Sequence, residues 1–454
     1  MKPVSSRLLL AIAVALAIIA AANFALISVY APYGSNSQVT WRDFRSAEGE
    51  VDTVLIGSSF AIYNINPYTV DEHLDALTYN LSSPSQSIGD ALLNLRCAVD
   101  ERPIKRVILS IGYETFTQTP QIRVSLINML ARADNQNPLK QIREFARLAL
   151  LPQYRSSASS FEALLPWSGL YSPEGAVSEL QAIAQRKTDY PDPADLTSVF
   201  DAFSFYVGRG HVDRADYNVW VPWREQSLQV YERGAEPLFK HENVQAFEAL
   251  CDFCRDNNLQ LYVLVSPRPS FEVQCLNEAY PTGMTQLQAI AQERGAAFID
   301  YNLARPEFYR ANIREFSDLQ HLNRGGVRRW SERLARDISA VEAGDDISNS
   351  FFAYNEWNNY LASLEGISAV KYFYGVGDGA IEFDAFSYAG SETQVEYSYR
   401  LVDTEGWVTI RPYSIDPHFS YPVEGHGVLK MVICARTQGS DVLMEQYFEN
   451  EIEY

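Results

Sequence analysis

Cysteine is scarce in this chain, with 5 among 454 residues. So few cysteines cannot form the dense disulfide framework of a small secreted protein. Cys251 and Cys254 have the spacing of a redox or metal-binding pair, but they share one helical face with Phe247 and Leu250. That pattern favours a buried apolar stripe. Because no second cluster completes a zinc site, we expect neither a metal nor another cofactor.

Positively charged residues are also few. The chain has 37 Lys and Arg residues and 57 Asp and Glu residues, which gives a net charge of −20. A protein that binds nucleic acid presents a basic surface to the phosphates, so we expect no nucleic-acid partner. The acidic balance suits a soluble domain that does not lie flat on anionic lipid. No internal repeat or low-complexity tract stands out, and the chain length suggests two globular domains.

One long apolar run is present at the start of the chain. Leu8–Val29 contains 22 uncharged residues and follows Lys2 and Arg7. This length spans a hydrocarbon core of about 30 Å, and the flanking positive charge predicts a cytoplasmic N-terminus. We therefore expect residues 1–30 to form a cytoplasmic tip and a single membrane anchor, with the rest of the chain outside the cell. A cleaved signal peptide ending near Ala20–Ala22 is the alternative.

Residues 31–345 have the pattern of an α/β domain. Short apolar runs indicate strands that are covered on both faces, as in a parallel sheet. Helical stripes beginning at Ile88, Phe247 and Val327 alternate with these runs, which predicts a doubly wound layer. The predicted strands are Val54–Ile56, Val107–Ile111, Leu259–Val265 and Ala297–Ile299.

An insertion interrupts this domain at about 115–243, which is too long for a simple crossover between strands. Helical patterns occur near Val124–Arg132 and Leu139–Leu150. We expect the insertion to cover the carboxyl edge of the sheet and to form a substrate lip. Trp220 and Trp223 are candidates for stacking on a sugar, or they pack the insertion against the domain.

Residues 350–454 follow a different pattern. After a break near Ala343–Asp346 and a short helical stripe at Trp357–Leu364, apolar residues alternate with polar ones. Such alternation predicts antiparallel strands, and we expect a compact β-sandwich accessory domain. The strand signals fall at Ile381–Ala385, Val395–Tyr399, Trp407–Ile410, Val428–Ala435 and Val442–Phe448.

Two short motifs contain candidate catalytic residues. Gly57-Ser58-Ser59 follows the first predicted strand, at the strand end where sites form in open α/β sheets. Asp318 and His321 are three residues apart, just before a helical stripe. A serine hydroxyl needs a base to remove its proton, and this spacing lets a carboxylate and an imidazole share one cleft. The alternative is structural, with a strand-end turn at 57–59 and a helix cap at Asp318.

Among the six histidines, His211 is the rival of His321 as the base. Its nearby carboxylate is Asp213. The other histidines lie in charged helical segments or in the β-rich region, away from the expected edge of the sheet. The pairing with a carboxylate three residues away favours His321.

The two motifs together resemble the SGNH/GDSL hydrolase-like superfamily, and especially its membrane-anchored branch, which includes the D-alanyl-lipoteichoic acid protein DltD and alginate O-acetylation proteins. The resemblance implies that Ser59 is the nucleophile, His321 the base and Asp318 the acid that holds the imidazole. It also implies that the N–H groups of Ser59 and Ser85 stabilise the oxyanion.

Two departures from the family pattern bear on function. Serines replace glycines in the second block, which begins at Asn80, and Glu114 occupies the place of the asparagine in the third block. Loss of an oxyanion donor costs about 10²–10³ in rate. Asn80 and Glu114 are further candidates for substrate binding.

The resemblance implies an exported acyltransferase or esterase that uses Ser59 on acyl esters of a cell-envelope glycopolymer, of teichoic acid or exopolysaccharide type. The alternative is a non-catalytic partner that binds the polymer or docks a membrane-bound O-acyltransferase. The intact Ser-His-Asp set favours the first function and the missing asparagine favours the second.

Overall fold

The computed structural model describes residues 33–134, 136, 138–154, 176–192, 204–214, 237–318, 320–377, 379–404 and 406–454, together with ten residues between 10 and 26. Among these residues, no helix is both long and apolar enough to cross a membrane. Most of the predicted anchor lies outside the described ranges, as do Trp220 and Trp223.

A five-stranded parallel sheet forms the centre of the first domain, in the order β2-β1-β3-β6-β7. The four predicted strands are confirmed as β1, β3, β6 and β7. Strand β2 is new, because three residues are too few to show a strand pattern in the sequence. The strands are β1 (Thr53–Gly57), β2 (Thr78–Asn80), β3 (Arg106–Ile111), β6 (Gln260–Val265) and β7 (Ala297–Asp300).

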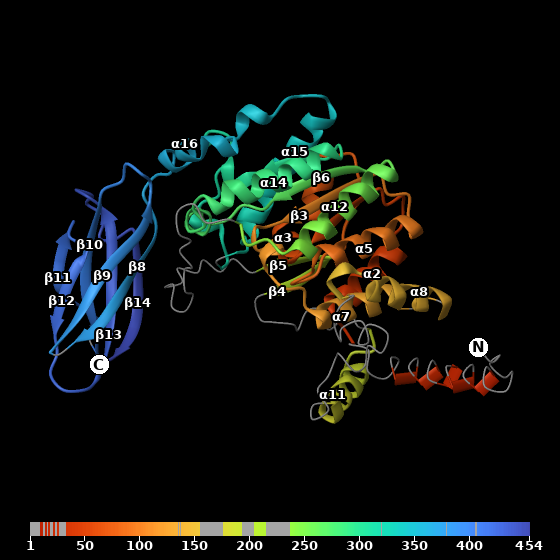
Figure 1. The fold of residues 1–454 in the computed structure, drawn as a ribbon, viewed down its shortest axis with the longest axis horizontal. Coiled ribbons are helices and arrows are strands. Elements are labelled where there is room, and N and C mark those ends of the chain that lie inside the picture. Colours follow the sequence, from red (N-terminus) through yellow and green to blue (C-terminus); the bar gives the residue numbers. More distant parts are fainter. Residues whose placement is uncertain are drawn as a thin grey trace, which may run out of the picture.

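Alternate strand residues face two separate hydrophobic cores. In β1, Val54 and Ile56 belong to one core and Leu55 to the other. Helices therefore cover both faces of the sheet (Figure 1), as a doubly wound layer requires. The first core receives side chains from α2 (Asn36–Ser46), α5 (Ile88–Glu101), α12 (His241–Asp256) and α14 (Ala279–Glu293), and the second from α4 (Pro67–Asp71) and α15 (Arg324–Glu342).

The two neighbouring cysteines lie inside the first core. Cys251 and Cys254 are each 1% exposed on α12 and pack among apolar side chains. Burial raises the pKa of the Cys251 thiol to about 12. Their interpretation as part of a buried apolar stripe is confirmed.

The insertion adds helices and a small hairpin. The two predicted helical segments are confirmed as α7 (Ile122–Ala133) and α8 (Pro138–Ala149). The insertion also contains α6 (Glu114–Thr117), α11 (Ala176–Asp189) and the antiparallel strands β4 (Ser204–Gly208) and β5 (His211–Arg214). This hairpin was not predicted, and it packs beside α3 (Ser59–Asn64).

The C-terminal region contains two separate antiparallel sheets, in the orders β11-β10-β13-β14 and β12-β9-β8. Their facing side chains form one core around Tyr399, Ile433 and Phe383, as in a sandwich. The last predicted strand, Val442–Phe448, is confirmed only from Gln446 onward, because Val442 and Leu443 lie in an exposed bend. The strands are β8 (Ile367–Gly377), β9 (Ala380–Ala389), β10 (Val395–Asp403), β11 (Gly406–Ser414), β12 (His418–Pro422), β13 (Val428–Thr437) and β14 (Gln446–Glu453).

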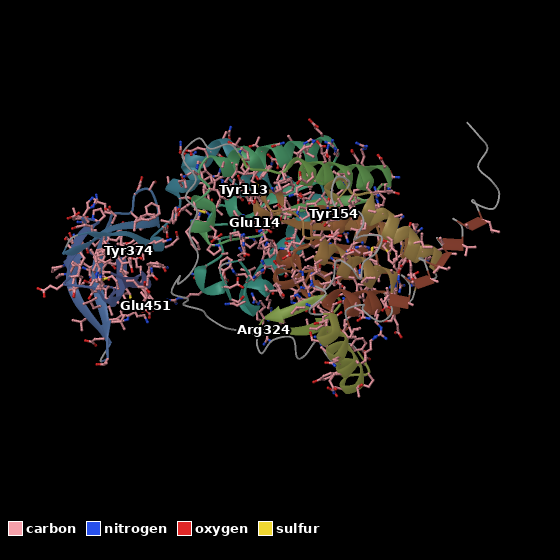
Figure 2. The ribbon with its side chains drawn as sticks, turned by 60° about the horizontal axis from the view of Figure 1, so that its bottom comes forward. Tyr113, Glu114, Tyr154, Arg324, Tyr374 and Glu451 are labelled. Atoms are coloured by element: carbon pink, nitrogen blue, oxygen red, sulfur yellow. The ribbon has the colours of Figure 1, made fainter. Side chains whose placement is uncertain are left out.

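The segment before the sandwich packs on the α/β layer. Phe352, Trp357 and Tyr360 are buried in the first core, and α16 (Trp357–Ala362) lies between the two regions (Figure 1). Direct contact comes from α13 (Ser270–Gln274), where the Gln274 side chain donates to the Ala389 carbonyl at 3.2 Å. Figure 2 shows Tyr374 and Glu451 in the antiparallel region and Glu114 in the α/β region.

Candidate active site

Ser59 stands at the point where β1 turns into α3. The turn depends on Gly57, whose φ of +146° is unfavourable for other residues. A side chain there would also collide with the Ser110 carbonyl oxygen of the neighbouring strand β3. Ser58 precedes the helix, and Ser59 is its first helical residue. The Ser59 N–H therefore has no carbonyl partner within the helix.

Asp318 and His321 are brought together as the sequence predicts. The Nδ1 atom of His321 lies 2.9 and 3.0 Å from the two carboxylate oxygens of Asp318. The same carboxylate accepts the backbone N–H groups of Gln320 and His321, each at 2.8 Å. Burial raises the pKa of Asp318, but the hydrogen bond and charge of His321, with those N–H groups and Arg214, outweigh it and lower the pKa overall. Asp318 is therefore ionised.

The His321 ring lies against helix α3. It stacks on Phe60 with the ring centroids 5.7 Å apart and meets Tyr63 edge-on at 5.0 Å. The Leu322 N–H donates to the Asn64 side chain at 2.9 Å, which ties the His321 loop to the end of the same helix. His321 thus lies beside the helix that begins with Ser59.

The other ring nitrogen of His321 is buried and unused. Its Nε2 atom makes no hydrogen bond to any residue that the structure describes, and no hydrogen bond joins it to Ser59. The acid–base half of the predicted triad is assembled. The predicted hydrogen bond between Ser59 and His321 is not formed in this structure.

Arg214, at the end of β5, is a site residue that the sequence did not identify. Its guanidinium forms an ion pair with Asp318 and lies over the Tyr63 ring, 5.0 Å from the centroid. It also lies 3.1 Å from the Nδ1 atom of His321. Because the carboxylate accepts only, and both its oxygens are nearer to Nδ1, we assign the Nδ1 proton to the bond with Asp318. The Nε2 lone pair is then free to act as a base.

The rival histidine is a structural residue. His211 on β5 is fully buried, and its Nδ1 atom lies 3.0 Å from the Ile62 carbonyl oxygen. Burial lowers its pKa to about 4, against the opposing effects of Asp213 and Ile62. His211 is therefore neutral and holds the hairpin against α3. Asp213 lies 3.8 Å from the Nε2 atom of His211 and forms an ion pair with Arg324 at 2.8 Å.

Ser85 has a backbone conformation that is typical of glycine. Its φ is +56°, in the left-handed region that favours glycine. The Ser85 N–H makes no hydrogen bond to a described residue. Ser59 and Ser85 line one cavity of about 110 Å³, together with Ser58, Phe60, Glu114 and Gln320. The two residues expected to donate to an oxyanion therefore line the same cavity.

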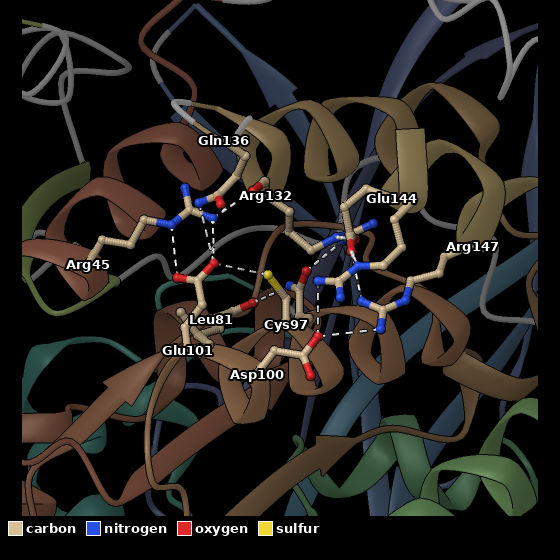
Figure 3. Close-up of polar contacts among 11 residues, drawn as sticks. Arg45, Leu81, Cys97, Asp100, Glu101, Arg132, Gln136, Glu144 and Arg147 are labelled. Atoms are coloured by element: carbon tan, nitrogen blue, oxygen red, sulfur yellow. Dashed lines mark hydrogen bonds and ion pairs between the residues drawn. The ribbon is translucent and has the colours of Figure 1, made fainter. Parts of the chain in front are cut away.

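A buried polar network supports the Ser85 loop (Figure 3). Asn94 on α5 donates to the Leu81 carbonyl at 2.6 Å and accepts from Arg132 on α7, also at 2.6 Å. Arg132 in turn pairs with Glu144 on α8 at 3.1 Å, with both side chains almost fully buried. The insertion helices thus brace the loop that follows β2.

Asn80 and Glu114 occupy different positions relative to the cavity. The Asn80 amide is fully buried, donating to the Ala61 carbonyl at 2.8 Å and accepting from the Ser82 N–H at 3.1 Å. It joins β2 to α3 and does not line the cavity. Glu114 does line the cavity and pairs with Arg268 at 2.6 Å.

Comparisons with known proteins give little further information. No family model matches the chain, and no curated protein matches it. A Streptococcus pneumonia structure provisionally called a platelet activating factor matches with 11% identity and a TM-score of 0.28, over 72% of this chain and 98% of that one. A gut microbial diltiazem-metabolizing enzyme, BT4096, matches with 9% identity and a TM-score of 0.19, over 80% of this chain and 71% of that one. At these TM-scores neither match carries an argument, and function must be inferred from the site.

Proposed function

We propose that the protein is a serine-dependent acyltransferase or esterase of the SGNH type. The observation that carries the proposal is the Asp318–His321 pair, which packs against the helix that begins at Ser59. Asp318 holds the proton on Nδ1 and leaves Nε2 as the base, which is the arrangement that a serine nucleophile needs.

The reaction begins when Ser59 Oγ attacks the acyl carbonyl carbon and its proton passes to His321 Nε2. The carbonyl oxygen becomes an oxyanion and accepts hydrogen bonds from the N–H groups of Ser59 and Ser85. The bond to the leaving alcohol then breaks, and that alcohol takes the proton from His321. Water or a second alcohol releases the acyl group from Ser59 by the same steps.

The substrate we propose is a short acyl ester on a cell-envelope glycopolymer, of teichoic acid or exopolysaccharide type. The cavity of about 110 Å³ suits a short acyl group better than a long chain. The apolar run Leu8–Val29 would hold the enzyme at the membrane with the site outside the cell. A membrane-bound O-acyltransferase is the partner that would supply or share the acyl group.

A non-catalytic role is the second candidate. The observation in its favour is Glu114 at the position where the SGNH family has a hydrogen-bond donor, together with the Nε2 atom of His321 that makes no hydrogen bond. In that case the cavity would bind polymer or dock an O-acyltransferase without forming a covalent intermediate.

A fluorophosphonate probe separates the two functions. We expect it to label the full-length protein at Ser59, and labelling to disappear in Ser59→Ala. Ser58→Ala is the matched control, because Ser58 is the neighbouring serine in the same cavity, and it should still be labelled. Absence of labelling in the wild type, or attachment of the probe to a residue other than Ser59, would overturn the proposal.

Envelope acylation tests the substrate class. Strains carrying Ser59→Ala or His321→Ala should lose polymer acylation to the same extent as a deletion strain. Turnover of a small soluble acetyl ester should be slow, because such an ester brings no binding energy from the polymer to position it. If both point variants restored acylation and the deletion did not, the protein would be a scaffold.

A further inference from the structure

Arg268 is a buried cation with one unused donor group. It follows β6, and its side chain is 9% exposed. The Nη2 atom donates to Glu114 at 2.6 Å, whereas the Nη1 atom is buried and makes no hydrogen bond to a described residue. A buried donor without a partner costs about 1–3 kcal/mol. Such a group points to an interaction that forms only when a ligand is present.

The guanidinium of Arg268 lies against the residues of the candidate site. Its central carbon is 4.3 Å from the centroid of the Phe60 ring, and Phe60 directly follows Ser59. The same ring stacks on His321. Arg268 is not itself among the residues that line the cavity of Ser59 and Ser85, but Phe60 and Glu114, which its guanidinium contacts, both line it.

The position of Arg268 is held by its surroundings. The Arg268 N–H donates to the Asn302 side chain at 2.8 Å, which fixes the backbone after β6. The Glu114 carboxylate folds back over Gly112, where a Cβ atom would lie 2.5 Å from it. Gly112 therefore allows Glu114 to reach the guanidinium. The pair is placed at the carboxyl ends of β3 and β6, on the edge of the sheet where ligands bind.

We propose that Arg268 is a catalytic residue whose Nη1 group donates to the oxyanion, with Glu114 as a positioning residue. This inference rests on the proposed function. As the bond from Ser59 Oγ to the acyl carbon forms, the carbonyl electron pair moves to oxygen and the serine proton moves to His321. Arg268 keeps its protons and donates one hydrogen bond, which a cation makes stronger than a neutral donor does. When the ester bond breaks, the electron pair returns to the carbonyl.

Arg268→Gln and Arg268→Lys test this role in the full-length protein. The readouts are the second-order rate of fluorophosphonate labelling at Ser59, and kcat and KM for p-nitrophenyl acetate. We expect Arg268→Gln to lower the labelling rate and kcat by about 10²-fold with little change in KM. Arg268→Lys should recover part of that loss, and Glu114→Gln should cause a smaller loss.

Arg305→Gln is the matched control. Arg305 pairs with Glu356 at 3.3 Å and lies 4.2 Å from the Phe352 ring centroid, an arrangement similar to that of Arg268. Glu356 and Phe352 do not line the cavity of Ser59, unlike the partners of Arg268, so the Arg305→Gln variant should be labelled at the wild-type rate. Thermal unfolding of both variants shows whether each is folded.

The outcomes separate this inference from the proposed function. If wild type is labelled at Ser59 and Arg268→Gln reacts at the same rate, Arg268 is only a counter-ion of Glu114. An increase in KM confined to negatively charged esters would assign Arg268 to substrate binding and also overturn the inference. If wild type is not labelled at Ser59, the proposed function fails first.

Discussion

Gly57 is the residue on which the position of Ser59 depends most directly. A Cβ atom would overlap the Ser110 carbonyl oxygen, and the φ of +146° is one that other residues rarely adopt. Backbone strain alone costs about 1–3 kcal/mol, and the overlap adds to it. The position of Ser59 therefore depends on the close approach of β1 and β3.

Gly57→Ala should therefore lower the free energy of unfolding by more than about 2 kcal/mol and slow fluorophosphonate labelling. Gly344→Ala is the control, since Gly344 also has a positive φ, +88°, but a Cβ atom there meets nothing within 4 Å. In that variant the free energy of unfolding should fall only by the cost of backbone strain, and the labelling rate should not change. Equal effects in the two variants, measured by denaturant unfolding, would contradict the steric argument.

His211 should make the stability of the protein depend on pH. Its pKa is about 4 in the folded state, below the ordinary value of 6.5, because burial disfavours the charged ring. The unfolded chain therefore binds more protons between pH 4 and 6.5. The contribution of His211 is fully present above pH 6.5 and is lost as the pH falls through about 4.

We expect the stability difference between wild type and His211→Asn to change by about 1–3 kcal/mol between pH 7 and pH 4.5, in the direction that disfavours wild type at low pH. Asparagine does not titrate, and its amide can still donate to the Ile62 carbonyl oxygen. Denaturant unfolding across this range measures the difference. A difference independent of pH would mean that His211 is not buried as the neutral form.

At the scale of elements, the insertion helices stabilise the loop that carries Ser85. Arg132 on α7 is fully buried between Glu144 of α8 and Asn94 of α5. Removal of the Arg132 guanidinium leaves the buried Asn94 side-chain oxygen without its donor, which costs about 1–3 kcal/mol, whereas Glu144 keeps its ion pair with Arg147 at 2.8 Å.

Arg132→Gln should therefore destabilise the protein by about 1–3 kcal/mol and slow labelling at Ser59, because Asn94 also holds the Leu81 carbonyl. Arg186→Gln, also in the insertion, is the control: Arg186 is 41% exposed and pairs with Glu179 at 3.5 Å. Such a surface pair contributes less than about 1 kcal/mol. Thermal unfolding and labelling rates check both variants. Unchanged labelling in a folded Arg132→Gln protein would show that the loop does not need the network.

In the molecule as a whole, an exposed segment joins α15 to residues that still pack on the α/β core, and the sandwich follows them. The segment at 343–349 is mostly exposed, whereas Phe352, Trp357 and Tyr360 are buried in the α/β core. Packing on both sides of the exposed segment makes it the natural point of separation.

Limited proteolysis should therefore cut first near Gly344–Asn349, since an exposed segment with few packed side chains opens most easily. Mass spectrometry of the fragments would locate the cleavage. The C-terminal fragment should begin with residues that pack on the α/β core, and so it should stay associated with the N-terminal fragment on size exclusion. Cleavage confined to 115–243, with the linker resistant, would indicate one fused unit.

Local patterns in the sequence were enough to predict the elements whose stability is local. Buried parallel strands need continuous apolar runs, and this is why β1, β3, β6 and β7 were predictable. The Asp318–His321 pair was predictable because both residues lie on one turn, three positions apart. The start of α15 was also marked locally, by the Asn323 side chain that accepts the Gly326 N–H at 3.1 Å.

Only the tertiary structure decided which distant residues complete the site. Arg214 lies 104 residues before Asp318, and Arg268 lies 154 residues after Glu114. Nothing local distinguishes these two among the 37 Lys and Arg residues of the chain. Their roles depend on the hairpin β4–β5 packing beside α3, and on the carboxyl ends of β3 and β6 becoming neighbours when the sheet forms. Contacts between residues far apart in the sequence leave no periodic pattern, because hydrophobic periodicity shows only which face of a single helix or strand is buried.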